Sequence, residues 1–184
     1  MSPGEQAADP QARVIQDSFH CDAGMVRLRP AVDIDLPLLG RIYASTRESE
    51  MAQVPWSEEQ KLAFLQFQFD AQHRYYVEHF PAATRDVVEI NGEAAGRLYL
   101  DARPSEIRLI DIALLPEFRG RGIGELLLRE ILDAGRRSQR AVSIHVEQNN
   151  PAMRLYLRLG FAPIEEQGIY HLMRWQPETS QEPS

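Results

Sequence analysis

The sequence predicts an α/β layered domain built around a mixed sheet. Three observations support this prediction. Strand-like runs alternate with amphipathic helical runs in the order βααβββαβαββ. Asn91-Gly92 separates two of the strand-like runs, and this dipeptide is the strongest short hairpin signal. The chain has 184 residues, 43% of them hydrophobic, which is enough for one domain with its own core.

The first half of the chain begins with a strand and continues with two helices. Residues 25–31 (MVRLRPA) alternate between apolar and polar side chains and predict the strand, while residues 33–47 predict a helix with Asp33 as its N-cap. Ser57 and Gln60 stand in a capping-box arrangement at the start of the second helix, and the hairpin strands follow it. The predicted helix spans 56–72, and the predicted hairpin strands span 85–90 and 93–102.

The second half has one strong helix between strands. Residues 106–115 predict a strand that ends at Pro116, and the helix that follows has a continuous apolar face. After a further strand, a short helix ends at Gly160, and the last two strands turn at Gly168. These remaining elements are predicted at 122–137 (helix), 141–147 (strand), 151–159 (helix), 161–166 (strand) and 169–175 (strand).

Composition separates a folded unit from two tails and restricts the function. Residues 1–24 and 176–184 are rich in Pro, Ser, Gln and acidic residues and predict flexible tails, which leaves 25–175 as the domain. A net charge of −7 and a pI near 5.3 argue against nucleic acid as the main partner and favour a cationic substrate. Cys21 is the only cysteine, so no internal disulfide can form. The start lacks a signal-peptide pattern, and no apolar run is long enough for a membrane span, so we expect a soluble cytoplasmic protein without a membrane partner.

The segment RGRGIG, residues 119–124, follows a predicted strand and precedes a predicted helix. A helix N-terminus has unpaired amides and a partial positive charge, so it can bind an anion such as a pyrophosphate. Glycines let a phosphate approach the backbone, while Arg119 and Arg121 add positive charge at the rim. The same glycines also fit a simple strand-to-helix turn with two solvated arginines. Neither a Walker loop nor a dinucleotide-binding fingerprint fits, because no Lys-Ser/Thr follows and Leu127 occupies the third glycine position.

A second group of residues lies in HVEQNNPAMRLYLRLGF, residues 145–161. Asn150 followed by Pro151 is a favourable helix start, so a structural role explains both residues. Tyr156 stands at the edge of the apolar stripe of the short helix, where a tyrosine is usually half packed and half solvated.

Taken in this order, the two segments resemble the GCN5-related N-acetyltransferase (GNAT) superfamily. Arg119, Gly122 and Gly124 match its acetyl-CoA signature Gln/Arg-x-x-Gly-x-Gly/Ala. Asn150, Leu155-Tyr156 and Gly160-Phe161 match its later segment. The resemblance implies an acetyltransferase domain over 25–175 with a mostly antiparallel, twisted sheet flanked by helices.

The resemblance also implies how acetyl-CoA, the co-substrate, would bind. The backbone of the strand before the loop would pair with the pantetheine arm, and that strand offers Ile112, Ala113 and Leu114. The pyrophosphate would contact the loop, and Asn150, or Asn149 one residue earlier, would contact the pantetheine. The loop residues are Arg119, Gly120, Arg121, Gly122, Ile123, Gly124 and Glu125. The two strands on either side of this region splay apart in the family, and the thioester reaches the acceptor through the gap.

Acetyl transfer to an amine needs a neutral nucleophile, an oxyanion-stabilising donor and a proton for the departing thiolate. Tyr156 is the candidate general acid, because a phenol of reference pKa about 10 is protonated at neutral pH. The amide of Leu114, at the end of the strand, is the expected oxyanion donor if the strand bulges as it does in the family. His145 and Asp111 are the rival candidates for the general base; a structural polar role for either, with a water chain as base, is the alternative. The five histidines show no metal-ligand spacing, so no metal is expected.

The expected activity is an acetyl-CoA-dependent N-acetyltransferase, a transferase of acyl groups, acting on a primary amine of a small molecule or a peptide. The acceptor site is expected in the segment after the first strand. Its acidic run Arg47-Glu48-Ser49-Glu50 and its aromatics could form the mouth, although most of the aromatics fit a core role. Those aromatics are Trp56, Phe64, Phe67, Phe69, Tyr75 and Tyr76. A non-catalytic acyl-CoA-binding module and a nucleotide-binding domain are the alternatives, and homodimerisation is left open.

Overall fold

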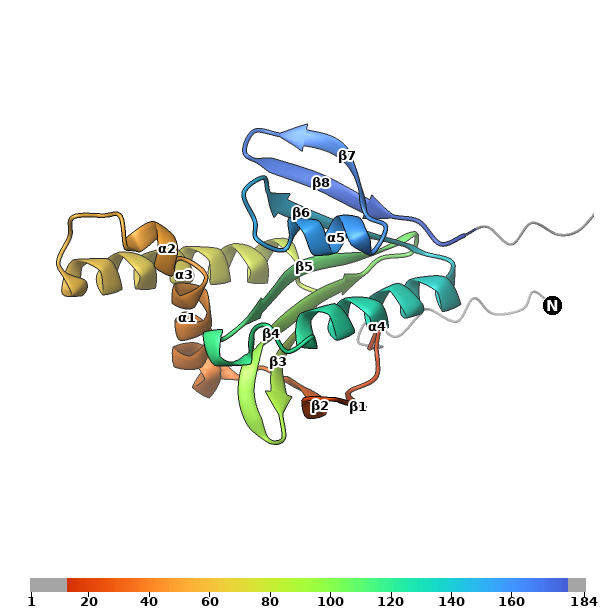
Figure 1. Ribbon diagram of the computed structural model, residues 1–184, viewed down its shortest axis with the longest axis horizontal. Helices are drawn as coiled ribbons and strands as arrows, with labels where there is room; N and C mark the ends of the chain where they lie inside the picture. The colour runs from red at the N-terminus through yellow and green to blue at the C-terminus, as the bar shows by residue number, and fades with distance from the viewer. Residues whose placement is uncertain (1–12, 179–184) are drawn as a thin grey trace, which may run out of the picture.

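An eight-stranded sheet forms the centre of the protein, in the order β1-β2-β3-β4-β5-β6-β8-β7. The computed structural model describes residues 13–178 (Figure 1). All neighbouring strands are antiparallel except β5 and β6. The strands are β1 Ser18–Cys21, β2 Gly24–Pro30, β3 Thr84–Ile90, β4 Glu93–Ala102, β5 Glu106–Leu114, β6 Ala141–Glu147, β7 Ala162–Gln167 and β8 Tyr170–Trp175.

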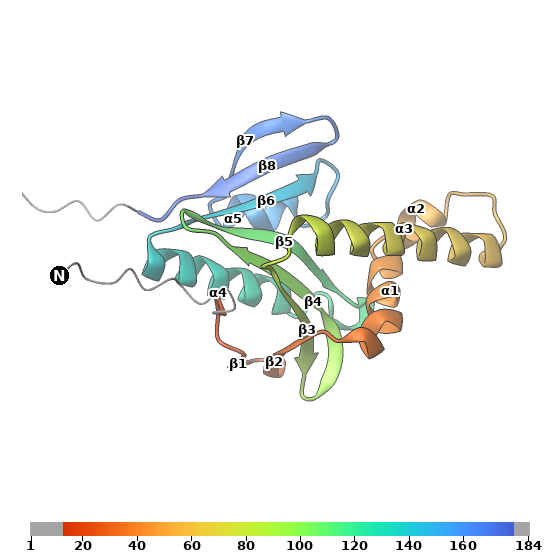
Figure 2. The same ribbon diagram turned by 180° about the vertical axis from the view of Figure 1, so that it is seen from behind.

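Helices cover both faces of the sheet. α4 lies across the face turned to the viewer in Figure 1, and α3 crosses the opposite face, which Figure 2 turns to the viewer. The helices are α1 Leu36–Ser45, α2 Glu48–Met51, α3 Glu58–His79, α4 Ile123–Ser138 and α5 Met153–Arg158, with short 3-10 turns η1 Asp33–Asp35 and η2 Pro116–Phe118. Within residues 13–178, none of these helices has the length and apolar composition that a bilayer crossing requires.

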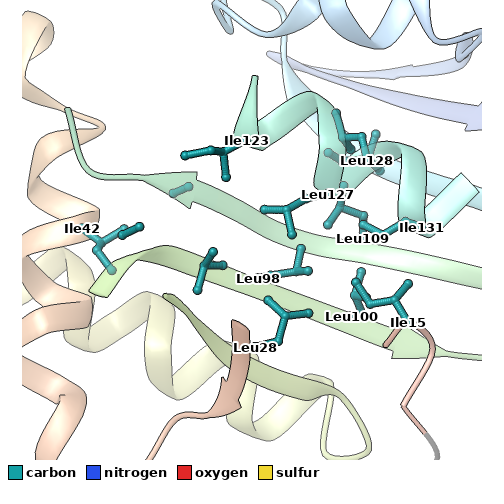
Figure 3. Packing of buried hydrophobic residues seen from close by; sticks show 14 of the residues in the cluster. Ile15, Leu28, Ile42, Leu98, Leu100, Leu109, Ile123, Leu127, Leu128 and Ile131 are labelled. Atoms are coloured by element: carbon teal, nitrogen blue, oxygen red, sulfur yellow. The ribbon is translucent and has the colours of Figure 1, made fainter. Parts of the chain in front are cut away.

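The main core lies between α4 and the strands β4 and β5 (Figure 3). Leu127 and Ile131 of α4 are completely buried, and they face Leu98 and Leu109 of the two strands (Figure 3). Each such side chain contributes about 1.5–3 kcal/mol through removal of its apolar surface from water. This packing fixes the start of α4 relative to the end of β5.

Local signals read from the sequence are confirmed at two turns. The Ser57 hydroxyl accepts from the Gln60 amide at 3.2 Å, and the Gln60 side chain accepts from the Ser57 amide at 2.9 Å, so the capping box forms. Asn91 and Gly92 adopt φ values of +52° and +84°, which a two-residue hairpin turn requires. The predicted order and the mostly antiparallel sheet are confirmed, with β1 and α2 as additional elements.

The sheet opens between its two parallel strands. β6 pairs with β5 only from Glu106 to Leu109, although β5 continues to Leu114. The register between β4 and β5 shifts at Ile110, which is the extra residue of a β-bulge. Because a bulge increases local bending, β5 leaves β6 at this point and a gap forms between them.

The predicted N-terminal boundary at residue 24 is wrong for the part of that segment that the structure describes. Arg13 forms an ion pair with Asp86 at 2.8 Å, Ile15 is 5% exposed, and β1 pairs with β2. Polar composition dominated the prediction, but a few apolar side chains and one arginine are enough to dock this segment on the sheet. Residues 1–12 and 179–184 of the predicted tails lie outside the described residues.

Candidate active site

The first turn of α4 presents a row of open backbone amides. The first hydrogen bond of the helix runs from the Leu126 amide to the Gly122 carbonyl at 3.0 Å. Within residues 13–178, the amides from Gly120 to Glu125 have no acceptor, and the N-cap position is a glycine without a capping side chain. Gly120 and Gly122 have φ values of +71° and +76°, and a Cβ added to either would meet nothing within 4 Å. The loop therefore has the free donors and the open backbone that a pyrophosphate needs.

The charged side chains of the loop are used within the protein. Arg119 donates from Nε to the Leu114 carbonyl at 2.8 Å and from Nη2 to the Ser45 hydroxyl at 2.8 Å. It therefore ties the loop to the ends of β5 and α1, instead of extending free positive charge from the rim as the sequence predicts. The guanidinium of Arg121 lies 5.5 Å from the centre of the Phe118 ring.

The carboxylate of Glu125 is paired with arginines and is not a free negative charge at the loop. It accepts from Arg129 at 2.7 Å and from Arg158 at 2.5 Å, and the hydrogen bond from Arg129 is the main reason that its pKa is lowered. Because Arg158 belongs to α5, this carboxylate also joins α5 to the first turn of α4. The candidate anion site at Glu125 is thus its backbone amide.

The last residues of β5 keep one backbone edge without a strand partner. Ile112 and Leu114 pair with β4, but β6 has already ended its pairing at Leu109. β5 bulges at Ile110, four residues before Leu114, because the register between β4 and β5 shifts there. The open edge beyond Leu109 is where the pantetheine arm is expected to pair.

A cavity of about 320 Å³ occupies the gap between β5 and β6. It brings together Asp111, His145, Asn150 and Tyr156, which the sequence places on four different segments. The other lining residues are Tyr43, Thr46, Arg47, Ser49, Glu50, Gln72, Tyr76, Arg97, Ile110, Ile112, Ala113, Ile144, Val146, Glu147, Asn149, Pro151 and Tyr170. Of the predicted carrier residues, Ile112, Ala113 and Asn150 line this cavity, whereas Leu114 and the loop residues lie outside its lining.

Tyr156 reaches the cavity from α5. Its side chain is 2% exposed, and its ring meets the Phe161 ring edge-on with centroids 5.7 Å apart. Burial raises the pKa of its phenol, and the negative charge of Asp111 raises it further. Tyr156 is therefore protonated at neutral pH and can act only as a proton donor there.

Asp111 is held by a buried arginine. Its carboxylate accepts from Arg97 at 2.8 and 3.3 Å and from the Tyr76 hydroxyl at 3.2 Å. Arg97 is 2% exposed and donates also to Gln72 at 2.9 Å. Three donors therefore occupy the lone pairs of the carboxylate, which limits Asp111 as a base.

His145 lies on β6 beside Arg108. The Nη2 of Arg108 donates to Nδ1 of His145 at 2.5 Å, and Nη1 of Arg108 donates to the Ser143 hydroxyl at 3.1 Å. The pKa of His145 is lowered, first by desolvation and then by the charge of Arg108. The imidazole is therefore neutral at pH 7.

The predicted N-cap at Asn150 is wrong, because α5 begins at Met153 with Ala152 as its N-cap and without a capping side chain. The Oδ1 of Asn150 accepts instead from the Ala152 amide at 2.8 Å, in the turn that leads into α5. Asn150 also lines the cavity. Asn149 lines the same cavity, so both asparagines remain available to a ligand.

Two lining arginines are not predicted as site residues by the sequence. Arg97 interrupts an apolar strand, and this lone charge is the signal that could identify it. Arg47 stands in an acidic run of the sequence, and in the structure it bridges Glu50 and Glu147, both at 2.9 Å, beside the cavity.

The aromatic residues predicted at the mouth differ in position: one lines the cavity, some pack against other aromatic rings, and some are exposed. Among these aromatics, only Tyr76 lines the cavity. Phe69 is buried against Tyr43, and Trp56 packs on Phe64 with centroids 5.3 Å apart. Phe67 and Tyr75 are exposed on α3. Within the described part of the chain, no three His, Cys, Asp or Glu side chains gather in a way that could hold a metal ion.

Comparison with known proteins links this geometry to one family. A model of the acetyltransferase (GNAT) family matches residues 42–161, which is more than half of the chain. A curated relative from Bacillus subtilis, described as a putative [ribosomal protein bS18]-alanine N-acetyltransferase, is 32% identical over 85 residues. That match covers 45% of this chain and 56% of the relative, so the chain spans about half the length of the curated relative.

Solved structures share the fold at low sequence identity. The PaiA N-acetyltransferase of Thermoplasma acidophilum, in complex with coenzyme A, has a TM-score of 0.63 and 16% identity, with 82% of this chain and 98% of that chain covered. The ribosomal-protein-S18-alanine N-acetyltransferase of Escherichia coli has a TM-score of 0.57 and 19% identity, with 86% and 97% covered. Both similarities support the same layered sheet architecture.

Proposed function

Because this chain belongs to the acetyltransferase (GNAT) family and is an acyltransferase, we propose that it transfers the acetyl group of acetyl-CoA directly to a primary amine of a small molecule or a peptide. One observation carries the proposal. The bulge-opened gap between β5 and β6 holds the protonated Tyr156, while the uncapped start of α4 follows β5 after η2 and a short glycine loop.

The chain offers a continuous set of backbone groups to the carrier. The amides from Gly120 to Glu125 would bind the pyrophosphate, with the partial positive charge of α4 behind them. The open edge of Ile112, Ala113 and Leu114 would pair with the pantetheine arm as an added strand does. The side-chain amide of Asn150, or of Asn149, would donate to the same arm. Bound in this way, acetyl-CoA supplies the activated acetyl group at the cavity.

Tyr156 is the proposed general acid. When the amine nitrogen bonds to the acetyl carbon and the carbon–sulfur bond breaks, the departing thiolate takes the phenolic proton. Burial and the charge of Asp111 raise the pKa of Tyr156, which keeps the phenol protonated before the step but makes it a weaker acid during it. The amide of Leu114 remains the proposed donor to the oxygen on which negative charge develops.

The amine must lose a proton, and His145 and Asp111 remain the two proposed acceptors. The carboxylate of Asp111 already accepts three hydrogen bonds. The imidazole of His145 is neutral at pH 7 and open to solvent, but its Nδ1 accepts from Arg108, so a water molecule could relay the proton to it only after that hydrogen bond opens. Asp111 also orients Arg97 and Tyr76 around the cavity.

A peptide amine is the first acceptor class to test. The two relatives described as alanine N-acetyltransferases of a ribosomal protein favour it. The cavity mouth also carries Glu50 and Glu147, which suit a cationic acceptor, although Arg47 neutralises part of their charge.

The test is release of free CoA thiol from acetyl-CoA in the presence of a panel of amines and short peptides. Turnover with any of them supports the proposal. The engagement of Asp111 and His145 by arginines favours a second candidate, a non-catalytic acyl-CoA-binding module. Calorimetric binding of CoA without acetylation of any amine would support the module, and absence of CoA binding would exclude both.

A further inference from the structure

A second cavity lies beneath the C-terminal half of α3, and it shares no lining residue with the cavity described above. Its volume is about 850 Å³, within the size range of small-molecule sites. Its walls come from η1, α1, α3, β3 and β4. The lining residues are Arg13, Pro30, Ala31, Val32, Asp33, Leu36, Leu39, His73, Val77, Pro81, Ala82, Ala83, Thr84, Arg85, Asp86 and Tyr99.

Two polar groups in this lining are buried without a partner. Tyr99 is 1% exposed, and its hydroxyl forms no hydrogen bond with any residue of the described chain. The Nε of Arg85 is also buried and unpaired within residues 13–178. Buried polar groups are nearly always hydrogen-bonded, so two unpaired donors in one cavity indicate an acceptor that the protein does not supply.

The rest of the Arg85 guanidinium is fixed. Its Nη2 donates to the carbonyls of Phe80 at 2.9 Å and Tyr76 at 3.2 Å, at the C-terminal end of α3. These two bonds hold the guanidinium in place between α3 and β3. The Nε donor is therefore held in position, as a binding group must be.

Two guanidinium groups lie close to the Tyr99 phenol: that of Arg85 lines the same cavity, and that of Arg97 lies 5.5 Å from the centre of the Tyr99 ring. Burial raises the pKa of the Tyr99 phenol; the charges of Arg97 and Arg85 oppose this rise, and the charge of Asp111 adds to it. The pKa of His73 is lowered first by burial and then by the same two arginines. Of the two carboxylates in the lining, that of Asp86 is bound by Arg13 at 2.8 and 3.2 Å, and Asp33 is exposed to solvent.

The remaining walls are mostly aliphatic. Leu36 and Leu39 come from α1, and Val77 comes from α3; the Ala and Pro residues of the two loops complete the surface. An occupant would therefore meet mainly apolar side chains, together with the polar residues Tyr99 and Arg85.

We propose that this cavity binds a small carboxylate with an apolar body, whose carboxylate accepts from the Tyr99 hydroxyl and the Arg85 Nε. Leu36, Leu39 and Val77 cover the apolar part. A carboxylate matches the donors because it has only acceptors, and its negative charge would pair with the Arg85 guanidinium. The site is separate from the acetyl-transfer cavity, so the proposal stands whether or not that activity is found.

The probe is hexanoate, with hexan-1-ol as the neutral match and acetate as the carboxylate without an apolar body. Binding to the full chain is followed by backbone amide shifts in NMR spectra and by calorimetry. We expect saturable binding of hexanoate with shifts at Val77, Ala83 and Tyr99, and weaker binding of both comparison compounds.

Variants separate the site from non-specific binding. Tyr99→Phe removes the unpaired hydroxyl and keeps the ring, so we expect unchanged or higher thermal stability and at least about fivefold weaker hexanoate binding. Arg85→Lys keeps the charge, lacks Nε and should weaken binding similarly. Tyr75→Phe, at a tyrosine that is 51% exposed on the outer face of α3, is the matched control and should bind as the native chain does.

The proposal is overturned if hexanoate at millimolar concentrations does not shift these amides. It is also overturned if hexan-1-ol binds as tightly as hexanoate, or if Tyr99→Phe binds hexanoate like the native chain. In those cases an ordered water satisfies the two donors, and the cavity has no preference for a carboxylate.

Discussion

Replacement of Tyr156 with Phe is the sharpest test of the catalytic assignment, because it removes one oxygen atom. The ring is 2% exposed and packs edge-on against Phe161, and Phe keeps that contact. The substitution removes only the hydroxyl and leaves the buried ring in place. We expect the free energy of unfolding to change by less than about 1 kcal/mol.

The effect on turnover should be much larger. A positioned general acid contributes about 10²–10⁴-fold to the rate, which corresponds to about 2.7–5.5 kcal/mol of activation free energy. We therefore expect kcat to fall by at least about 100-fold. The affinity for CoA should not change, because the proposed pyrophosphate donors lie on the loop and first turn from Gly120 to Glu125.

The pH profile provides a second readout. Burial and Asp111 raise the pKa of Tyr156 above its ordinary value of about 10, so the acid form persists through that pH. The active chain should show no alkaline loss that belongs to Tyr156 below about pH 10. On the acidic side, the pKa of His145 is lowered, so its neutral form is lost only below about pH 6.5.

The assay is thiol release from acetyl-CoA with an amine that the native chain accepts, combined with CoA calorimetry on the same samples. Tyr75→Phe is the control, because this exposed tyrosine lies outside the cavity lining. If Tyr156→Phe keeps more than about a third of the native kcat at every pH, Tyr156 is not the proton donor and the argument from its pKa fails.

Three further predictions concern the loop and the charges of the cavity. Gly122→Ala should lower the free energy of unfolding by about 1–2 kcal/mol, because Gly122 has a left-handed φ. It should also weaken CoA binding measured by calorimetry. Gly168 has a similar φ of +63° and open surroundings, so the control Gly168→Ala should carry the same strain and keep the affinity for CoA. Asp111→Asn should lose about 3–5 kcal/mol in chemical denaturation, because the buried guanidinium it neutralises stays charged; a loss within error would contradict the buried ion pair. Arg108→Met should raise the pKa of the imidazole of His145 in an NMR titration and move the acidic limb of activity to higher pH, whereas an unchanged titration would exclude Arg108 as a cause of its lowered pKa.

The elements that the sequence predicted well depend on local chemistry. The hairpin at Asn91-Gly92 and the capping box at Ser57 require only residues within a few positions of each other, so the printed sequence contains the whole signal. The loop before α4 was identifiable for the same reason, because glycines at Gly120 and Gly122 need no distant partner to take positive φ.

The parts that the sequence missed depend on distant partners. The sequence predicts Arg119 as a free positive charge at the rim of the loop. In the structure its guanidinium donates to the hydroxyl of Ser45, which lies 74 residues earlier in the chain. Ile15 lies in a polar context that predicts a tail, yet the sheet provides an apolar surface that buries it. The α2 helix has four residues and no periodic signal long enough to read.

The position of the bulge explains why the candidate site forms where it does. A regular β5 would pair with β6 along its length, and the region now occupied by the cavity would hold ladder hydrogen bonds. The extra residue at Ile110 ends that pairing after four residue pairs. Beyond this point the facing edges of β5 and β6 have no strand partner in each other, and other groups must hold them in place. Arg47 supplies one support by bridging the end of β6 to α2, and Arg97 supplies the other by fixing Asp111 on β5. A buried ion pair adds little stability over apolar residues of the same size. The pair of Arg97 and Asp111 is therefore better explained by its position in the site. It holds the open edge of β5, and it keeps a negative charge beside the phenol of Tyr156, the proposed acid.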